Sequence, residues 1–192
     1  MKPLLAILMA ISAAASYAEP VKMDTAQKRK LDTFFSNFSE SHVAGFKQGS
    51  LTDHAMLQFA LSHLYINNLK SLKKSEDGNS VTASDKQVDT ATAKYFDRRI
   101  ASHKKQAYTI PAASGEAFVF SQIDTLEDAG NATFKATGTI YSTDSGATPD
   151  VHATPAAWKN AGQEIDATGK FHALIRKLAD RYVLIEYTPG EM

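Results

Sequence analysis

The 192-residue sequence contains no cysteine. Without a thiol, the chain can form no disulfide, no cysteine-ligated zinc or iron–sulfur site and no thiolate nucleophile. Its fold must therefore rest on packing alone, and a chain of this length can bury a core of sufficient size. The formal net charge is zero, so the sequence also lacks the basic balance that nucleic-acid-binding proteins show.

A hydrophobic run long enough to cross a membrane is missing as well. The apolar run at the N-terminus, Leu4–Ala15, has roughly a dozen residues, short of the roughly 20 that cross a bilayer as a helix. Lys2 precedes this run, and Ser16-Tyr17-Ala18 places small residues at the two positions that a signal peptidase reads before Glu19. The pattern predicts a secretory signal peptide over residues 1–18.

The rest of the chain, residues 19–192, is expected to form a single domain of ordinary size. The short leader with one lysine indicates a bacterial protein, so we expect the mature chain in the periplasm or the medium. No cysteine follows the leader to carry a lipid. We therefore expect no membrane partner after cleavage, and no nucleic-acid partner.

Charge is unevenly distributed along the chain although it sums to zero. Residues 19–110 carry a net charge of +4, and residues 111–192 carry −5. Two such halves attract each other if they pack together in one domain. The other interpretation is a basic surface that meets an acidic partner.

Apolar residues in the first half recur at helical spacing. The first predicted helix begins at Asp24, which can form a capping box with Gln27. It carries its apolar stripe over Leu31–Phe46 and ends at Gly45–Gly49.

Two further helices are predicted in this half. The second, Thr52–Lys74, is apolar around nearly its whole circumference, which is typical of a central, buried helix. The third begins at Ser84, with Gln87 in the capping-box position, and has Lys104 and Lys105 in its last turns.

The second half changes to the alternating pattern of strands. Strands are predicted over residues 106–111, 116–126 and 132–143, followed by a hairpin over 170–188 that turns near Ala179-Asp180. Residues 144–167 form an irregular insertion, in which Thr154-Pro155 can cap a short helix carrying Trp158.

Helices followed by strands indicate an α+β fold. We expect the three N-terminal helices to pack on one face of a roughly five-stranded antiparallel meander sheet. This order of elements resembles the cone-shaped folds of the NTF2-like and cystatin-like kind, in architecture only. No sequence motif of either family is present, so no functional residue is carried over.

No catalytic or metal-binding motif stands out. The six histidines include no pair three or four residues apart on a helix, and His54 and His63 fall on opposite faces of theirs. A serine–lysine spacing occurs at Ser71–Lys74 and again at Ser102–Lys105, without its companion motifs. We therefore expect no metal site and no cofactor.

Two features are candidates for ligand or partner contact. Trp158, the single tryptophan, is either an accessible contact in the insertion or an anchor that pins the insertion to the core. A cavity between helices and sheet is the second candidate, with a filled core as its alternative. Its expected lining is Tyr95, Tyr108, Phe118, Phe120 and His172.

These patterns favour a non-catalytic binding or interaction module of the cell envelope, whose partner is an envelope protein or a small apolar ligand. One alternative is a small cofactor-free hydrolase or isomerase, with His63, Tyr65 and Asp97 as acid–base candidates. His63 also lies beside Asn67 on a mostly apolar helix, which is typical of a hydrogen-bonded core or boundary histidine. A second alternative is a periplasmic inhibitor or immunity protein that acts through the insertion.

Overall fold

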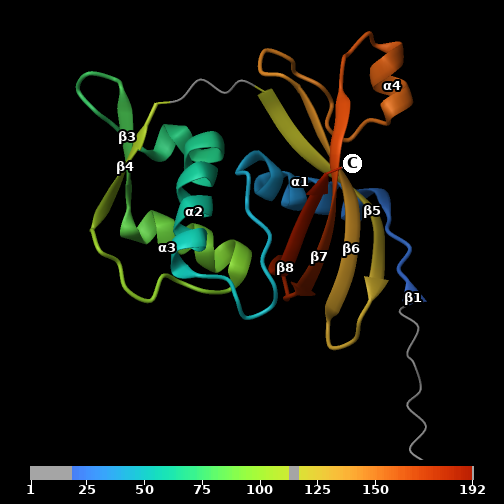
Figure 1. The fold of residues 1–192 in the computed structure, drawn as a ribbon, viewed down its shortest axis with the longest axis horizontal. Coiled ribbons are helices and arrows are strands. Elements are labelled where there is room, and N and C mark those ends of the chain that lie inside the picture. The colour runs from blue at the N-terminus through green and yellow to red at the C-terminus, as the bar shows by residue number, and fades with distance from the viewer. Residues whose placement is uncertain (1–18, 113–116, 192) are drawn as a thin grey trace, which may run out of the picture.

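The computed structural model describes residues 19–112 and 117–191. Within them the chain folds into four α-helices and two antiparallel sheets (Figure 1). The α+β class predicted from the sequence is confirmed. The arrangement of the helices and strands differs from the predicted one.

The larger sheet contains four long strands with a two-residue strand at its edge. In the order β1-β5-β6-β7-β8, neighbouring strands are hydrogen-bonded and antiparallel. The predicted strands over 116–126 and 132–143 and the terminal hairpin are all present. The strands are β1 (Glu19–Pro20), β5 (Ala117–Asp128), β6 (Thr133–Asp144), β7 (Asp166–Lys177) and β8 (Tyr182–Glu191).

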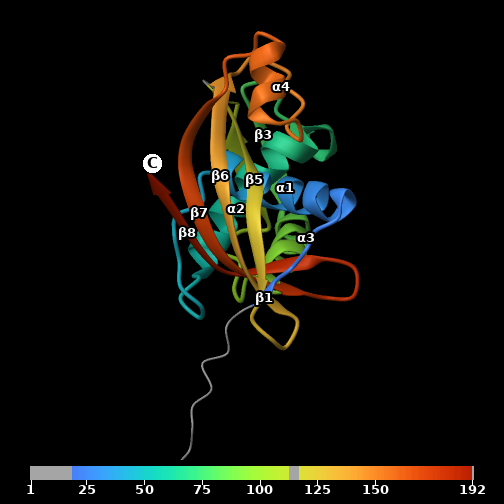
Figure 2. The same cartoon turned by 90° about the vertical axis from the view of Figure 1, so that its right-hand side faces the viewer.

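Helix α1 (Thr25–Glu40) packs against this sheet (Figure 2). The Asp24 side chain caps it by accepting a hydrogen bond from the Gln27 N–H at 2.7 Å. The helix ends at Glu40, nearer the N-terminus than the predicted end at Gly45–Gly49. His42 adopts a left-handed conformation with φ of 49°, and Phe46 instead pairs its backbone with Tyr187 of β8.

The second layer combines two helices with the smaller sheet. Its order β2-β3-β4 includes the predicted strand over 106–111, which pairs with β3 and is not part of the larger meander. Strand β3 was not anticipated from the sequence. The elements are α2 (Asp53–Asn68), the 3₁₀ turn η1 (Leu69–Ser71), β2 (Lys73–Lys74), β3 (Ser80–Ser84), α3 (Asp85–Phe96) and β4 (Ala107–Pro111).

The predicted lengths of these two helices are wrong at their C-terminal ends. Helix α2 ends at Asn68, because the chain passes into η1 and then places Lys73 and Lys74 in a strand. The capping box at Ser84 and Gln87 of α3 is confirmed. Helix α3 stops at Phe96, where Asp97 adopts a left-handed conformation with φ of 54°.

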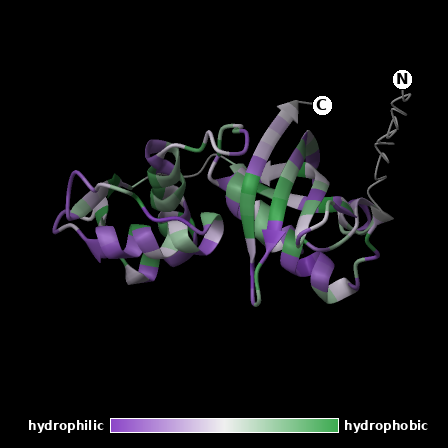
Figure 3. Cartoon of the chain, turned by 90° about the horizontal axis from the view of Figure 1, so that it is seen from below, coloured by the Kyte–Doolittle hydropathy of each residue, from purple (hydrophilic) through white to green (hydrophobic). Residues whose placement is uncertain are grey.

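The expectation that three helices cover one face of a single sheet is therefore wrong. Only α1 lies along the larger sheet, whereas α2 and α3 pack on each other and on the smaller sheet, beside it (Figure 3). The reason is that β3 carries buried Val81 and Ala83, which need a cover of their own. Helix α3 also contacts β8, and this contact joins the layers.

A single aromatic cluster fills the space where the layers meet. Phe38 of α1 stacks on Phe59 of α2 with ring centroids 5.1 Å apart, and its edge contacts Tyr95 of α3 at 5.7 Å. On the sheet side, Phe35 contacts Phe171 of β7 at 4.4 Å. The two layers therefore share one hydrophobic core.

The insertion contains the predicted short helix, α4 (Pro155–Asn160). The Thr154 side chain caps it by accepting from the Ala157 N–H at 3.2 Å, with Pro155 in the first turn. Figure 1 shows α4 at the end of the larger sheet that lies away from α3.

Candidate binding groove

Trp158 is an anchor of the insertion and not an accessible contact. Its side chain is 3 % exposed, and its ring meets Phe120 and Tyr141 edge-on at 5.4 and 5.1 Å. The indole N–H donates to the Asp150 carbonyl at 2.8 Å. The interpretation of an exposed ring in the insertion is corrected, because α4 turns this ring onto the sheet.

The five residues expected to line one cavity lie on different surfaces. Phe118 and Phe120 pack beneath the insertion, in a cluster separate from the main core. His172 is exposed on β7, because it alternates with buried Phe171 and successive side chains of a strand point to opposite faces. Tyr108 belongs to the smaller sheet, so only Tyr95 reaches the space between α1 and α3.

The three acid–base candidates are not brought together either. His63 is buried in the second layer, where it stacks on Phe59 at 5.6 Å. Asp97 instead forms ion pairs with Arg176 and Arg181, at 3.2 Å each. Tyr65 follows His63 on α2 and is partly buried.

His63 is a hydrogen-bonded core histidine. Its Nδ1 lies 3.3 Å from the Asn67 side-chain nitrogen, and the same amide donates to the Glu40 carboxylate. Burial lowers the pKa of His63 to about 4, and the nearby Lys94 ammonium adds to this shift. Burial also raises the pKa of Glu40. An uncharged imidazole at neutral pH follows.

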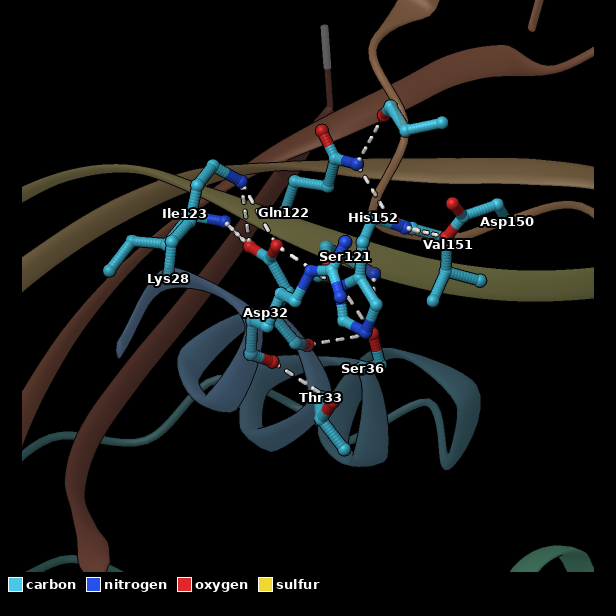
Figure 4. A network of polar contacts seen from close by, with 12 residues as sticks. Lys28, Asp32, Thr33, Ser36, Ser121, Gln122, Ile123, Asp150, Val151 and His152 are labelled. Atoms are coloured by element: carbon cyan, nitrogen blue, oxygen red, sulfur yellow. Dashed lines mark hydrogen bonds and ion pairs between the residues drawn. The ribbon is translucent and has the colours of Figure 1, made fainter. Parts of the chain in front are cut away.

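A polar network on α1 covers the edge of β5 (Figure 4). Asp32, 1 % exposed, accepts from the Ile123 N–H at 2.8 Å and from the Lys28 ammonium at 3.0 Å. Ser36 accepts from the Ser121 N–H at 2.9 Å. The backbone N–H groups at this edge of β5 have no neighbouring strand to bond to, and the side chains of α1 accept their hydrogen bonds instead. A strand edge can be buried only when its backbone groups are satisfied in this way.

The same network holds the insertion. His152 lies 3.4 Å from the Asp32 carboxylate, and the Gln122 amide donates to the carbonyls of Val151 and Ala153 at 2.7 and 2.8 Å. These groups have protein partners throughout. We therefore assign this network to the fold and not to a ligand site.

Three titratable side chains form a hydrogen-bonded row that the sequence did not predict. His103 lies between Asp89 of α3 and Tyr108 of β4, at 3.0 Å and 2.8 Å. Asp89 also accepts from the Ile100 N–H at 3.1 Å. The row therefore fastens the segment after α3 to its neighbours. No spacing in the sequence links these residues, since they come from a helix, a loop and a strand.

A groove runs between α1, the β7–β8 turn and α3; we call it the α1–β8 groove. Its wide end encloses about 340 Å³ beside the first turn of α1 and the β7–β8 turn. Its narrow end encloses about 140 Å³ and reaches between α1 and α3. The two ends share Lys30, Arg181 and Tyr182. Figure 2 shows the turn projecting beside α1.

The narrow end combines cations with aromatic rings. No carboxylate of the described residues lines it, and Thr33 and Asn37 are its polar uncharged residues apart from two tyrosines. The remaining lining residues are Lys30, Lys94, Arg181, Phe34, Tyr95 and Tyr182. Such a surface attracts a negatively charged group and offers apolar contact to whatever carries that group.

Two of the three lysines that line the groove, Lys30 and Lys94, are positioned over aromatic rings. The Lys94 ammonium lies 4.9 Å from the Tyr95 ring centroid, and that of Lys30 lies 5.8 Å from the Tyr182 centroid. Lys30 also donates to the Asp180 carbonyl at 2.8 Å across the wide end. These contacts hold both charges at the groove while leaving the Lys94 ammonium without an acidic partner among the described residues.

Arg181 is fixed between two carboxylates at the junction of the layers. Its guanidinium donates to Asp97 at 3.2 Å and to Asp180 at 3.3 Å. Its Nε is buried, and no described residue forms a hydrogen bond with it.

Sequence reasoning missed the basic residues of the groove. Lys30, Lys94 and Arg181 are far apart in the chain and lie on two helices and a turn. Each one alone is an ordinary surface cation. Only the packing of α3 against β8 brings them to one place.

Comparison of the chain with protein-family models, with curated proteins and with solved structures finds no match. In the part of the chain that the structure describes, no helix has the length and apolar character needed to span a membrane. The described residues also contain no group of three or more His, Asp or Glu side chains arranged for a metal ion.

Proposed function

We propose that the protein is a non-catalytic binding module of the bacterial cell envelope, exported through residues 1–18 to the periplasm or the medium. Its α1–β8 groove takes a small acidic ligand, in which a carboxylate or phosphate is attached to a compact apolar or aromatic group. The observation that carries this proposal is the meeting of Lys30 and Lys94 beside the rings of Phe34, Tyr95 and Tyr182 at the narrow end, where neither lysine forms an ion pair with a carboxylate of the described residues.

The volume of the narrow end limits the size of the apolar group that the ligand can carry. A cavity of about 150 Å³ holds a benzene ring, and the narrow end encloses about 140 Å³. The wide end, about 340 Å³, leaves room for the remainder of a larger molecule, such as the end of an acidic peptide of an envelope protein. The proposal thus changes the expected small apolar ligand into an apolar group with a negative charge.

The two alternatives receive less support from the geometry. A hydrolase or isomerase requires converging acid and base groups, and His63, Tyr65 and Asp97 do not converge. An inhibitor that acts through the insertion requires a protruding contact, whereas the central residue of that segment, Trp158, is buried.

Titration with simple probes tests the proposal. Benzoate, inorganic phosphate and the neutral analogue benzyl alcohol are added to the mature protein, and the ring resonances of Tyr95 and Tyr182 are followed by NMR. We expect benzoate to shift both rings and to bind more tightly than benzyl alcohol. Lys94→Gln should weaken benzoate binding about fivefold, which corresponds to about 1 kcal/mol.

Lys159→Gln is the matched control, because Lys159 is an exposed lysine on α4 at the other end of the molecule. It should bind benzoate as the unchanged protein does. The proposal fails if benzoate and phosphate leave both tyrosine rings unshifted, or if Lys94→Gln and Lys159→Gln bind equally tightly.

A further inference from the structure

Helix α2 leaves part of its apolar surface uncovered. Its sequence is apolar around nearly the whole helix, yet it lies at the outside of the second layer. Ile66 is 48 % exposed and Leu69 is 38 % exposed, and they are the large hydrophobic side chains most open to solvent in the described chain. They lie three residues apart, where α2 passes into η1.

Three exposed lysines follow this exposed pair in the chain. Lys70, Lys73 and Lys74 follow Leu69 directly and are exposed. No carboxylate of the described residues forms an ion pair with any of them.

Two hydrogen bonds bring more lysines to the same end of the second layer. The Gln87 amide donates to the Ser71 carbonyl at 3.1 Å, and the Asp85 N–H donates to the Gln106 carbonyl at 3.0 Å. The start of α3 and the segment before β4 therefore lie beside η1. We call the resulting surface the lysine end, and its exposed members are Ile66, Leu69, Lys70, Lys73, Lys74, Lys86, Lys104 and Lys105.

Two of the acidic residues near the lysine end have partners within their own part of the fold. Asp77 accepts from the Ser75 hydroxyl at 2.6 Å and the Asn79 N–H at 3.0 Å within its own turn. Asp89 is held by His103. These hydrogen bonds do not cancel the formal charge of either carboxylate. Six lysines therefore stand beside four acidic residues, Glu76, Asp77, Asp85 and Asp89, and the lysine end keeps a net positive charge.

We propose that the lysine end binds an anionic lipid surface, with Ile66 and Leu69 entering the interface and the lysines facing the headgroups. Clusters of four to eight basic residues beside apolar side chains are suited to such surfaces, and each lysine adds to the attraction. The lysines come from four segments, and none of them forms an ion pair with a carboxylate of the described residues. This fits the diffuse charge of headgroups better than the fixed charges of a folded protein. The uneven charge of the sequence had two interpretations, and the lysine end corresponds to the second, a basic surface that meets an acidic partner.

This proposal concerns reversible attachment to a membrane surface and replaces the expectation of no membrane partner. It is independent of the α1–β8 groove, because none of the groove residues belongs to the lysine end. Either proposal can therefore fail without the other.

Sedimentation of the mature protein with lipid vesicles tests it. We expect the protein to sediment with phosphatidylglycerol vesicles and to stay in solution with phosphatidylcholine vesicles. Salt at about 1 M, where the Debye length is about 3 Å, should release it. The triple variant Lys70→Glu, Lys73→Glu, Lys74→Glu should bind phosphatidylglycerol at least about tenfold more weakly.

Two further variants test the contribution of the apolar pair and the importance of where the lysines lie. Ile66→Ser with Leu69→Ser should also weaken binding, because it removes the side chains that enter the interface. The control, Lys135→Glu with Lys159→Glu, changes exposed lysines of the other layer and should bind as the unchanged protein does. All positions are exposed, and thermal melting verifies that each variant folds.

The proposal is overturned if phosphatidylglycerol and phosphatidylcholine vesicles bind equally, or if the control weakens binding as much as the triple variant. It is also overturned if the protein forms a dimer that Ile66→Ser with Leu69→Ser dissociates while vesicle binding stays unchanged. In that case a second copy covers the exposed pair.

Discussion

His63 shows how a single side chain can look functional in the sequence and serve the core in the structure. It is 4 % exposed, lies between the rings of Phe59 and Tyr95, and shares the Asn67 amide with Glu40. Its neutral form fits this environment, because the ring accepts a hydrogen bond from Asn67 through Nδ1 and forms no ion pair with a carboxylate of the described residues. Protonation would place a charge in an apolar cluster.

The pH dependence of stability should reveal this. The pKa of His63 is lowered from 6.5 to about 4. Between pH 6.5 and pH 4 this histidine is therefore protonated in the unfolded chain and neutral in the folded chain. Stability from this group is therefore lost as pH falls from 6.5 toward 4, by up to about 3 kcal/mol at 1.36 kcal/mol per pKa unit.

Urea denaturation of the unchanged protein and of His63→Gln at pH 7 and pH 4.5 measures the effect. The loss of stability on acidification should be smaller in His63→Gln, because the other titrating groups are common to both proteins. His172→Gln removes an exposed histidine and should keep the original pH dependence. An identical pH dependence in all three proteins would contradict the lowered pKa.

Trp158 is a second residue whose environment can be measured directly, since it is the only tryptophan. Because its ring is buried against Phe120 and Tyr141, its fluorescence should be blue-shifted and poorly quenched by acrylamide. Trp158→Ala should destabilise by about 3–5 kcal/mol. Trp158→Phe, which keeps a ring but loses the bond to Asp150, should cost less. Emission typical of tryptophan in water would refute the burial.

At the scale of elements, the larger sheet needs a glycine in β6. A Cβ at Gly138 would lie 2.2 Å from Phe171 Cε1 and 2.3 Å from the Gln122 carbonyl oxygen. The aromatic ring could adjust, but the neighbouring strand's backbone could not without disturbing the pairing of β5 with β6.

Gly138→Ala should therefore destabilise by about 3 kcal/mol, at the upper end of ordinary overpacking. Gly146→Ala is the control, because a Cβ there meets nothing within 4 Å and the backbone is not left-handed. Chemical denaturation of both variants compares them. Equal midpoints would show that the sheet tolerates the added methyl group.

Helix α1 is the element on which both layers pack. Phe38 is fully buried and contacts rings from α2, α3 and β8. Phe38→Ala should destabilise by about 3–5 kcal/mol, a severe loss for a domain with about 5–15 kcal/mol in total. Ile66→Ala, at an exposed position, should change stability by less than about 0.5 kcal/mol. A loss below about 1 kcal/mol for Phe38→Ala would show that the α1 stripe is not buried.

At the scale of the whole molecule, the two layers are joined by the core around Phe38 and by the ion pairs of Asp97 with Arg176 and Arg181. The α1–β8 groove lies beside this junction. A ligand that bridges Lys30 of α1 and Lys94 of α3 would therefore contact both layers. Such a ligand should raise the stability of both layers together, so that the whole chain still unfolds in a single transition.

The start of the mature chain is a prediction at the same scale. Cleavage before Glu19 would retain β1, since Glu19 pairs with Asp128 and Pro20 with Glu127. Mass spectrometry of the protein exported by its own host should give a chain that begins at or near Glu19. Recovery of an exported chain that still carries Met1 would contradict the proposed signal peptide.

Local signals predicted most elements of this fold. The caps at Asp24, Ser84 and Thr154 and the alternating strands of the larger sheet depend on neighbours within a few residues. The helix ends after Glu40 and Asn68 were missed because apolar residues beyond them continue the helical spacing. Phe46 leaves that pattern only because β8 supplies a backbone partner.

The sequence by itself determined the α+β class, the start of each main helix, the terminal hairpin and the exclusion of thiol chemistry, because each of these follows from composition or short-range pattern. Tertiary structure alone decided that the helices divide between two layers, that Trp158 is buried and that Lys30, Lys94 and Arg181 meet at one groove. Those outcomes depend on contacts between residues far apart in the chain, and neither hydrophobic period nor residue spacing encodes which distant surfaces will pack together.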